Sequence, residues 1–238
     1  MHQILRLSLL AFASVVLLSG DDPSWRQKSI AEWDGQDAKQ VLADSPWVKN
    51  VKLERVRYLS EFERRDSGNW EAGIAARDGL GFDLTPLLGL FGPTYASKVN
   101  ELARRLGPDA GNAAVRWESA PAVRAAEPKA GEAGAPVWQG DYYAIAVYDV
   151  SPPFRWNLAA VLKGLASLKR DNKKDVKPSR VQILHRENGL ITVVYLFPRS
   201  AQITSKDASV RFVAQIGPLV VSQFFFPGEM QLTGEPEL

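Results

Sequence analysis

The sequence predicts an α+β fold in which an antiparallel C-terminal meander sheet is packed by a few helices. From Arg180 to Leu238 the chain alternates short apolar segments with clear turn signals, which is typical of consecutive antiparallel strands. Other parts of the chain show apolar residues at helical spacing. The burial of side chains within the C-terminal run is too small to offset the backbone entropy of ordering it. The meander is therefore expected to be stable only when other parts of the chain pack against it.

The first 20 residues have the layout of a secretory signal peptide. A single Arg6 precedes an apolar run from Leu7 to Leu18, and the small residues Ser19 and Gly20 follow. This run is too short for a comfortable membrane span. We expect cleavage near Gly20 and a periplasmic or extracellular protein. An uncleaved N-terminal anchor remains the alternative, because Leu18 lies where a small residue is preferred.

Residues 21–126 are expected to form an N-terminal α+β part. The second half of 24–44 has helical spacing and starts near Asp34 or Gly35, and Ser45-Pro46 ends it. The segment 60–96 is irregular but apolar, which is typical of a covering segment or a lid. The remaining elements expected here are a mixed-face edge strand at 50–59, a helix at 97–106, a strand at 114–119, and one or two helical turns at 120–126 capped by Ser119.

Residues 127–136 (EPKAGEAGAP) are predicted to be a flexible connection to the C-terminal part at 137–238. That part is expected to form one interdependent unit with 21–126. It begins with a strand from Tyr142 to Val150, a helix from Trp156 to Lys169, and a solvated basic loop from Lys169 to Arg180. The meander strands then follow at 181–183, 190–197, 210–216, 219–226 and near 230–233, with hairpin turns at Asn188-Gly189 and Gly217-Pro218.

Composition excludes several classes of function. The chain contains 29 basic and 27 acidic residues and no cysteine, so it has no disulfide and lacks the basic excess of a nucleic-acid binder. Zinc and iron–sulfur sites are made unlikely by the missing thiolates. Beyond the leader only His185 could serve as an imidazole ligand or base. We therefore expect no metal, no cofactor and no nucleic-acid partner, and contact with a membrane only through an uncleaved leader.

Glu118 is the most suggestive catalytic candidate. Its neighbour Trp117 could raise the pKa of the carboxyl and stack on a sugar ring, as in carboxylate-dependent glycan hydrolases. The alternative is an ion pair of Glu118 with Arg116 on the same strand face, or with Arg199. Trp47, Arg116, Trp117 and Arg199 are the candidate binding residues. For Trp47 and the nearby Trp25 and Trp33 the competing interpretation is packing of the N-terminal helix on the sheet.

Short motifs resemble a group of exported bacterial proteins of uncharacterised activity. They are Ser45-Pro46-Trp47, the run from Val115 to Ala120 (VRWESA), Phe197-Pro198-Arg199-Ser200, and the series Asp207, Phe212, Phe225, Met230 and Gly234. The resemblance covers most of the chain after the leader. It implies export and a shared fold, and it supplies no mechanism. Leaders in that group often look like lipoprotein signals, whereas Asp21 here occupies the position that a lipidated cysteine would need.

Two functions follow as hypotheses. The first is a non-catalytic envelope or periplasmic protein that binds or supports an unknown envelope component, either protein or polysaccharide. The alternative is a carboxylate-dependent hydrolase of cell-wall or extracellular glycan. The hydrolase requires a second carboxylate about 5–10 Å from Glu118 in an open cleft. An arginine paired with Glu118 in a filled core would contradict it.

Overall fold

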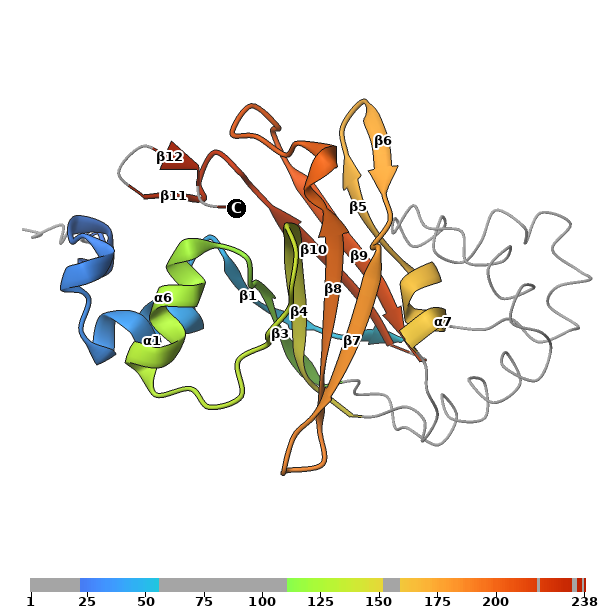
Figure 1. The fold of residues 1–238 in the computed structure, drawn as a ribbon, viewed down its shortest axis with the longest axis horizontal. Helices are drawn as coiled ribbons and strands as arrows, with labels where there is room; N and C mark the ends of the chain where they lie inside the picture. Colours follow the sequence, from blue (N-terminus) through green and yellow to red (C-terminus); the bar gives the residue numbers. More distant parts are fainter. Residues whose placement is uncertain (1–21, 56–110, 152–158, 218, 233–234, 237) are drawn as a thin grey trace, which may run out of the picture.

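A computed structural model describes residues 22–55, 111–151, 159–217, 219–232, 235–236 and 238 (Figure 1). The predicted leader, covering segment at 60–96 and helix at 97–106 lie outside these ranges. Within them the fold is α+β, as the sequence predicts, with antiparallel sheets and short helices.

Two five-stranded antiparallel sheets form the centre of the protein. We call them sheet A, with strand order β1-β3-β4-β8-β7, and sheet B, with strand order β2-β10-β9-β5-β6. The strands of sheet A are β1 (Val48–Lys52), β3 (Asn112–Trp117), β4 (Tyr142–Val150), β7 (Arg180–His185) and β8 (Ile191–Pro198). Those of sheet B are β2 (Glu54–Arg55), β5 (Ala166–Arg170), β6 (Lys173–Val176), β9 (Val210–Ile216) and β10 (Leu219–Phe225). A separate pair of short strands, β11 (Gln231–Leu232) and β12 (Glu235–Pro236), completes the described strands.

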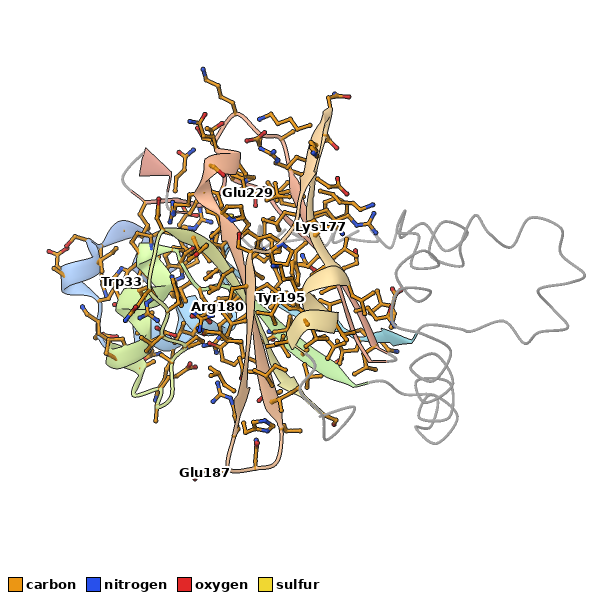
Figure 2. All side chains as sticks on the ribbon, turned by 45° about the vertical axis from the view of Figure 1, so that its right-hand side comes forward. Trp33, Lys177, Arg180, Glu187, Tyr195 and Glu229 are labelled. Carbon is orange, nitrogen blue, oxygen red and sulfur yellow. The ribbon has the colours of Figure 1, made fainter. Side chains whose placement is uncertain are left out.

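The chain passes between the sheets along both of their edges. On one edge, β1 of sheet A continues through Leu53 into β2 of sheet B, and on the other edge β6 of sheet B leads into β7 of sheet A. Each crossing thus joins an edge strand of one sheet to an edge strand of the other. Figure 2 shows Tyr195 among the side chains at the centre of the molecule and Glu187 at the tip of the β7–β8 hairpin.

The hydrophobic core draws on both halves of the chain. Trp117 of β3 makes edge-on contacts with Tyr143 of β4 and Phe225 of β10, at ring-centroid distances of 5.8 and 5.2 Å. Tyr195 and Phe197 of β8 contact Phe212 of β9 in a similar way. The contacts of Phe225 and Phe212 connect sheet B to sheet A, and edge-to-face geometry is the arrangement that ring quadrupoles favour.

A helical layer lies beside the sheets, on the left in Figure 1, and contains α1 (Gly35–Ala43) and α6 (Pro121–Ala130). Asp34 caps α1 by accepting hydrogen bonds from the backbone N–H groups of Gln36 and Asp37, which satisfies donors that a helix start leaves unpaired. The short 3₁₀ helices η1 (Ser24–Gln27) and η2 (Ile30–Glu32) precede α1. As predicted, an α-helix occupies the second half of 24–44.

Close contact between α1 and α6 holds the helical layer together. A Cβ atom on Gly35 would lie 3.2 Å from the backbone oxygen of Lys129, so the glycine allows the two backbones to approach. The Lys129 ammonium donates hydrogen bonds to the backbone oxygens of Ile30, Ala31 and Trp33 at 2.7–3.1 Å. The last turn of α6 is thereby tied to the segment that precedes α1.

The C-terminal strands match their predicted bounds closely, but they do not form one sheet. The β7–β8 hairpin belongs to sheet A and the β9–β10 hairpin to sheet B. The link between them contains η4 (Arg199–Ala201) and carries the chain from one sheet to the other. Pro198 marks this change of direction, since proline cannot donate to a continuing strand ladder.

The helix predicted from Trp156 to Lys169 is wrong in its second half. Helix α7 (Ala159–Gly164) ends at Gly164, and β5 begins at Ala166. Ala166 and Leu168 pack in the core and pair with Ala214 and Phe212 of β9, so tertiary pairing overrides the local helical pattern. The predicted loop at 169–180 contains the β5–β6 hairpin, whose turn places Asn172 at φ 56°.

Two details of the segment around α6 also need correction. The predicted cap Ser119 does not cap the helix; Ala120 occupies that position without a side-chain bond, and the Ser119 hydroxyl accepts a hydrogen bond from the Ala144 N–H. The predicted flexible connection at 127–136 begins inside the helix, because residues 127–130 form the last turn of α6. Gly131 ends that turn at φ 74°, a conformation that glycine adopts without strain.

Candidate functional site

Glu118 lies just beyond the end of β3, on the outer face of sheet A. Alternate residues of β3 point to opposite faces, so Ala113, Val115 and Trp117 enter the core between the sheets. Arg116 and Glu118 therefore belong to the other face. There the side chains of Ala144, Ala146, Tyr148, Val194 and Leu196 form a second, smaller hydrophobic cluster. Glu118 is 0 % exposed.

Tyr148 of β4 lies on the same outer face of sheet A as Glu118, beside Ala144 and Ala146. The pairing of β4 with β8 shifts register between Val147 and Val150, and Asp149 within this bulge has φ 59°. Tyr148 itself pairs with Ala114 of β3 in regular register, so ordinary strand alternation places its side chain on this face. The Tyr148 hydroxyl donates a short hydrogen bond to Glu118 Oε1. The phenol thus satisfies one of the two carboxyl oxygens.

The second carboxyl group comes from the helical layer. Glu127 of α6 is 2 % exposed and shares a hydrogen bond with Glu118. Glu118 Oε2 and Glu127 Oε1 are buried and receive no hydrogen bond from another donor within the described parts of the chain. Since two carboxylates cannot hydrogen-bond without a proton, the two carboxyl groups share one, and Glu118 is the donor.

Two arginines flank the carboxyl pair and bind other groups as well. Arg116 forms a bidentate ion pair with Glu132, with N–O distances of 2.5 and 2.9 Å, and its guanidinium lies 4.5 Å from the centroid of the Tyr148 ring. Arg124 donates to Glu127 Oε2 at 3.0 Å and to the backbone oxygen of Pro136 at 2.9 Å. We call Arg116, Glu118, Arg124, Glu127, Glu132 and Tyr148 the polar cluster.

Burial dominates the electrostatics of the polar cluster. Desolvation and the nearby charge of Glu127 raise the pKa of Glu118 to about 8, and desolvation also raises the pKa of Glu127. The same causes, burial first and then the Glu118 charge, raise the pKa of Tyr148. Burial lowers the pKa of Arg116, but Glu132 outweighs it, so the net pKa is raised. Glu118 therefore holds its proton at neutral pH.

The predicted ion pairs of Glu118 are not the ones that form. Arg116 pairs with Glu132, and Arg199 pairs with Asp141 at 2.8 Å and donates to the backbone oxygen of Leu238 at 2.5 Å. The Arg199 guanidinium also lies over the Tyr143 ring. The structure brings Arg116 and Glu118 into one cluster but places Arg199 in a different one.

Trp47 and Trp117 are core residues. Both are 0 % exposed, and Trp47 packs on Trp25, which contacts Trp33 in turn. The Trp33 indole N–H donates to the backbone oxygen of Trp25. The packing interpretation of the N-terminal tryptophans is therefore confirmed, and neither Trp47 nor Trp117 presents a surface to a ligand.

Sequence reasoning missed most of the polar cluster. Glu127 and Glu132 fall in the segment expected to be flexible, and Tyr148 was part of a strand with no assigned role. One local signal does point to Glu127: Pro121 at the first helical position and Gly131 after the last one are typical of helix boundaries. The contact between Glu127 and Glu118 has no local signal, since it joins two layers of the fold.

Within the described residues, no group of three or more His, Cys, Asp or Glu side chains could hold a metal ion. His185 is exposed at the end of β7. In the same part of the chain, no helix is long and apolar enough to cross a membrane.

Comparisons with known proteins add no family assignment. No protein-family model matches the chain, and neither a curated protein nor a solved structure matches it.

Proposed function

We propose that this protein is an exported, non-catalytic envelope or periplasmic protein that binds or supports another envelope component. The observation that carries the proposal is the state of Glu118, the one acid that favours a hydrolase. Its carboxyl group is buried and hydrogen-bonded to Glu127 and Tyr148. In glycan hydrolases the two carboxyl groups are about 5–10 Å apart, with the scissile bond between them. Carboxyl groups in direct contact leave no room for a sugar.

The arrangement of the neighbouring charges supports the same proposal. A general acid must reach the leaving group of its substrate, whereas the polar cluster closes over Glu118 from sheet A and from α6. The arginine nearest to it, Arg116, is occupied by Glu132. These contacts are those of a structural network that joins two layers. The partner of the protein is then an envelope protein or polysaccharide recognised by another surface.

The Glu118→Gln variant tests the hydrolase alternative. We expect purified wild-type protein and Glu118→Gln to release no more reducing ends from peptidoglycan or envelope polysaccharide than buffer does. An active glycan hydrolase serves as the positive control, and Glu187→Gln at the exposed hairpin tip is the matched acid-to-amide variant. Release by wild type and by Glu187→Gln that is lost in Glu118→Gln would establish the hydrolase and overturn the proposal.

Export is tested by the N-terminus of the protein in cells. The leader predicts a mature chain that starts near Asp21. We expect intact-mass measurement of the tagged protein from a periplasmic or culture fraction to lack residues 1–20. Recovery of the full-length chain in the membrane fraction would favour the uncleaved anchor, and recovery of full-length chain in the cytoplasm would contradict export.

A further inference from the structure

The proton between Glu118 and Glu127 joins two separate layers of the fold. Glu118 extends from the end of β3 in sheet A, and Glu127 belongs to α6 in the helical layer. One oxygen of each carboxyl group, Glu118 Oε2 and Glu127 Oε1, is buried and receives no hydrogen bond from another donor in the described ranges. Without the proton, two negatively charged groups would face each other with little access to water. Such an arrangement is strongly unfavourable.

The charged groups around the pair do not replace this proton. Arg116 of β3 forms its bidentate pair with Glu132, which follows α6. Arg124 of α6 contacts only Glu127 of the two acids, and its side chain is 40 % exposed. Tyr148 of β4 already donates to Glu118. Arg186, after β7, lies over the Tyr148 ring and donates to Thr192. Glu127 and Glu132 thus each pair with one arginine, and the proton that Glu118 shares with Glu127 balances the charge of the third carboxyl group.

Other contacts show what the pair holds in place. After α6 the chain from Glu132 to Asp141 runs beside sheet A, and Trp138 packs against the cluster of Ala144, Ala146, Val194 and Leu196 on its outer face. The Arg124 guanidinium lies 5.1 Å from the centroid of the Trp138 ring. Next to it, Val137 is 74 % exposed. The helix and the following segment therefore cover an apolar surface whose closure depends on a few polar contacts.

We propose that the proton shared by Glu118 and Glu127 is a latch that keeps α6 and the segment up to Asp141 closed on sheet A, and that rising pH releases it. Opening places both carboxyl groups in water, where they ionise at ordinary pH. The open form then binds one proton fewer than the closed form, and linkage makes opening more favourable as the pH rises. The pKa of Glu118, which is raised to about 8, marks the upper end of the pH range over which opening becomes more favourable. Above it the closed form has lost the proton as well.

Hydrogen exchange followed by mass spectrometry tests the latch on the intact chain. Exchange of residues 121–141 is measured from pH 5.5 to 8.5 and corrected for the intrinsic dependence of amide exchange on pH. We expect protection of these residues to fall by about tenfold per pH unit up to about pH 8 and then to level off. Peptides from β8 and β9 report global unfolding and are expected to remain protected at every pH.

Two variants test whether the pH dependence of protection at 121–141 arises from the Glu118–Glu127 pair. Glu118→Gln and Glu127→Gln each supply an amide donor for the shared hydrogen bond, so we expect their protection at 121–141 to be independent of pH. Glu187→Gln at the hairpin tip (Figure 2) is expected to retain the wild-type slope. A wild-type protection that does not change with pH overturns the proposal. A slope that persists in whichever Gln variant folds overturns it too, and the wild-type series decides alone if neither folds.

Discussion

Replacement of Trp117 by alanine is expected to lower the free energy of unfolding by about 3–5 kcal/mol. The indole is 0 % exposed and touches Tyr143 in sheet A and Phe225 in sheet B. Loss of the indole would leave a cavity where the two sheets meet. The strands β4 and β10 cannot close around this cavity, because each is paired with a neighbouring strand on both sides. The measurement is chemical denaturation of wild type and Trp117→Ala at one pH.

Two control variants separate packing at this site from other effects. Trp117→Phe keeps an aromatic ring and removes a buried indole N–H that has no acceptor among the described residues, so we expect a smaller loss than for alanine. Val137→Ala at an exposed position should change stability by less than about 0.5 kcal/mol. A Trp117→Ala protein as stable as wild type would mean that Trp117 is not a core residue. Its candidacy as a binding residue would then return.

The strands of the C-terminal run could be predicted because their signals are local. Asn188-Gly189 tolerates the backbone of a tight turn, and Gly189 has φ 78°, while alternation fixes which residues of β7 and β8 face the core. The strand from Tyr142 to Val150 was predicted with its observed bounds for the same reason. The assignment of the two hairpins to different sheets is not encoded in any one segment. It depends on how β8 and β9 pair with β4 and β5, which lie earlier in the chain.

The candidate site shows the same division between local and distant information. Glu118 was singled out because Trp117 precedes it and could raise its pKa. Its pKa is raised, but the cause is burial and the charge of Glu127. Trp117 points to the opposite face of β3, as strand geometry requires. Local sequence thus pointed to a carboxyl group with a raised pKa, whereas the partners that surround it come from α6 and β4.

As far as the carboxyl groups of Glu118 and Asp37 determine it, the free energy of unfolding is expected to be largest near pH 4–5. The pKa of Glu118 is raised from 4.5 to about 8 by burial, so the folded chain holds a proton that the unfolded chain loses. The stability that depends on this proton is complete below about pH 4.5 and is lost as the pH rises towards 8. Each pKa unit corresponds to about 1.4 kcal/mol, so the loss amounts to a few kcal/mol.

Asp37 of α1 acts in the opposite direction. Hydrogen bonds from Lys28 and Ser24 lower its pKa from 3.8 to about 2, because they stabilise the ionised carboxylate. Its contribution is present above about pH 4 and is lost as the pH falls towards 2. Of these two groups, Asp37 contributes to the acid side of the stability profile and Glu118 to the alkaline side, and each contribution can be removed by its own variant.

Denaturant unfolding from pH 3 to 9 measures how the free energy of unfolding changes on the acid side and on the alkaline side. In Glu118→Gln the amide retains a donor towards Glu127 and an acceptor for Tyr148 at every pH, so the fall in stability between pH 5 and 8 should disappear while the fall below pH 4 stays. Asp37→Asn should make the fall below pH 4 smaller, with Glu32 and Asp207 still contributing to it, and should leave the fall between pH 5 and 8 unchanged. If Glu118→Gln keeps the full alkaline slope, the proton is not held by this pair, because no other change in the variant alters proton binding between pH 5 and 8.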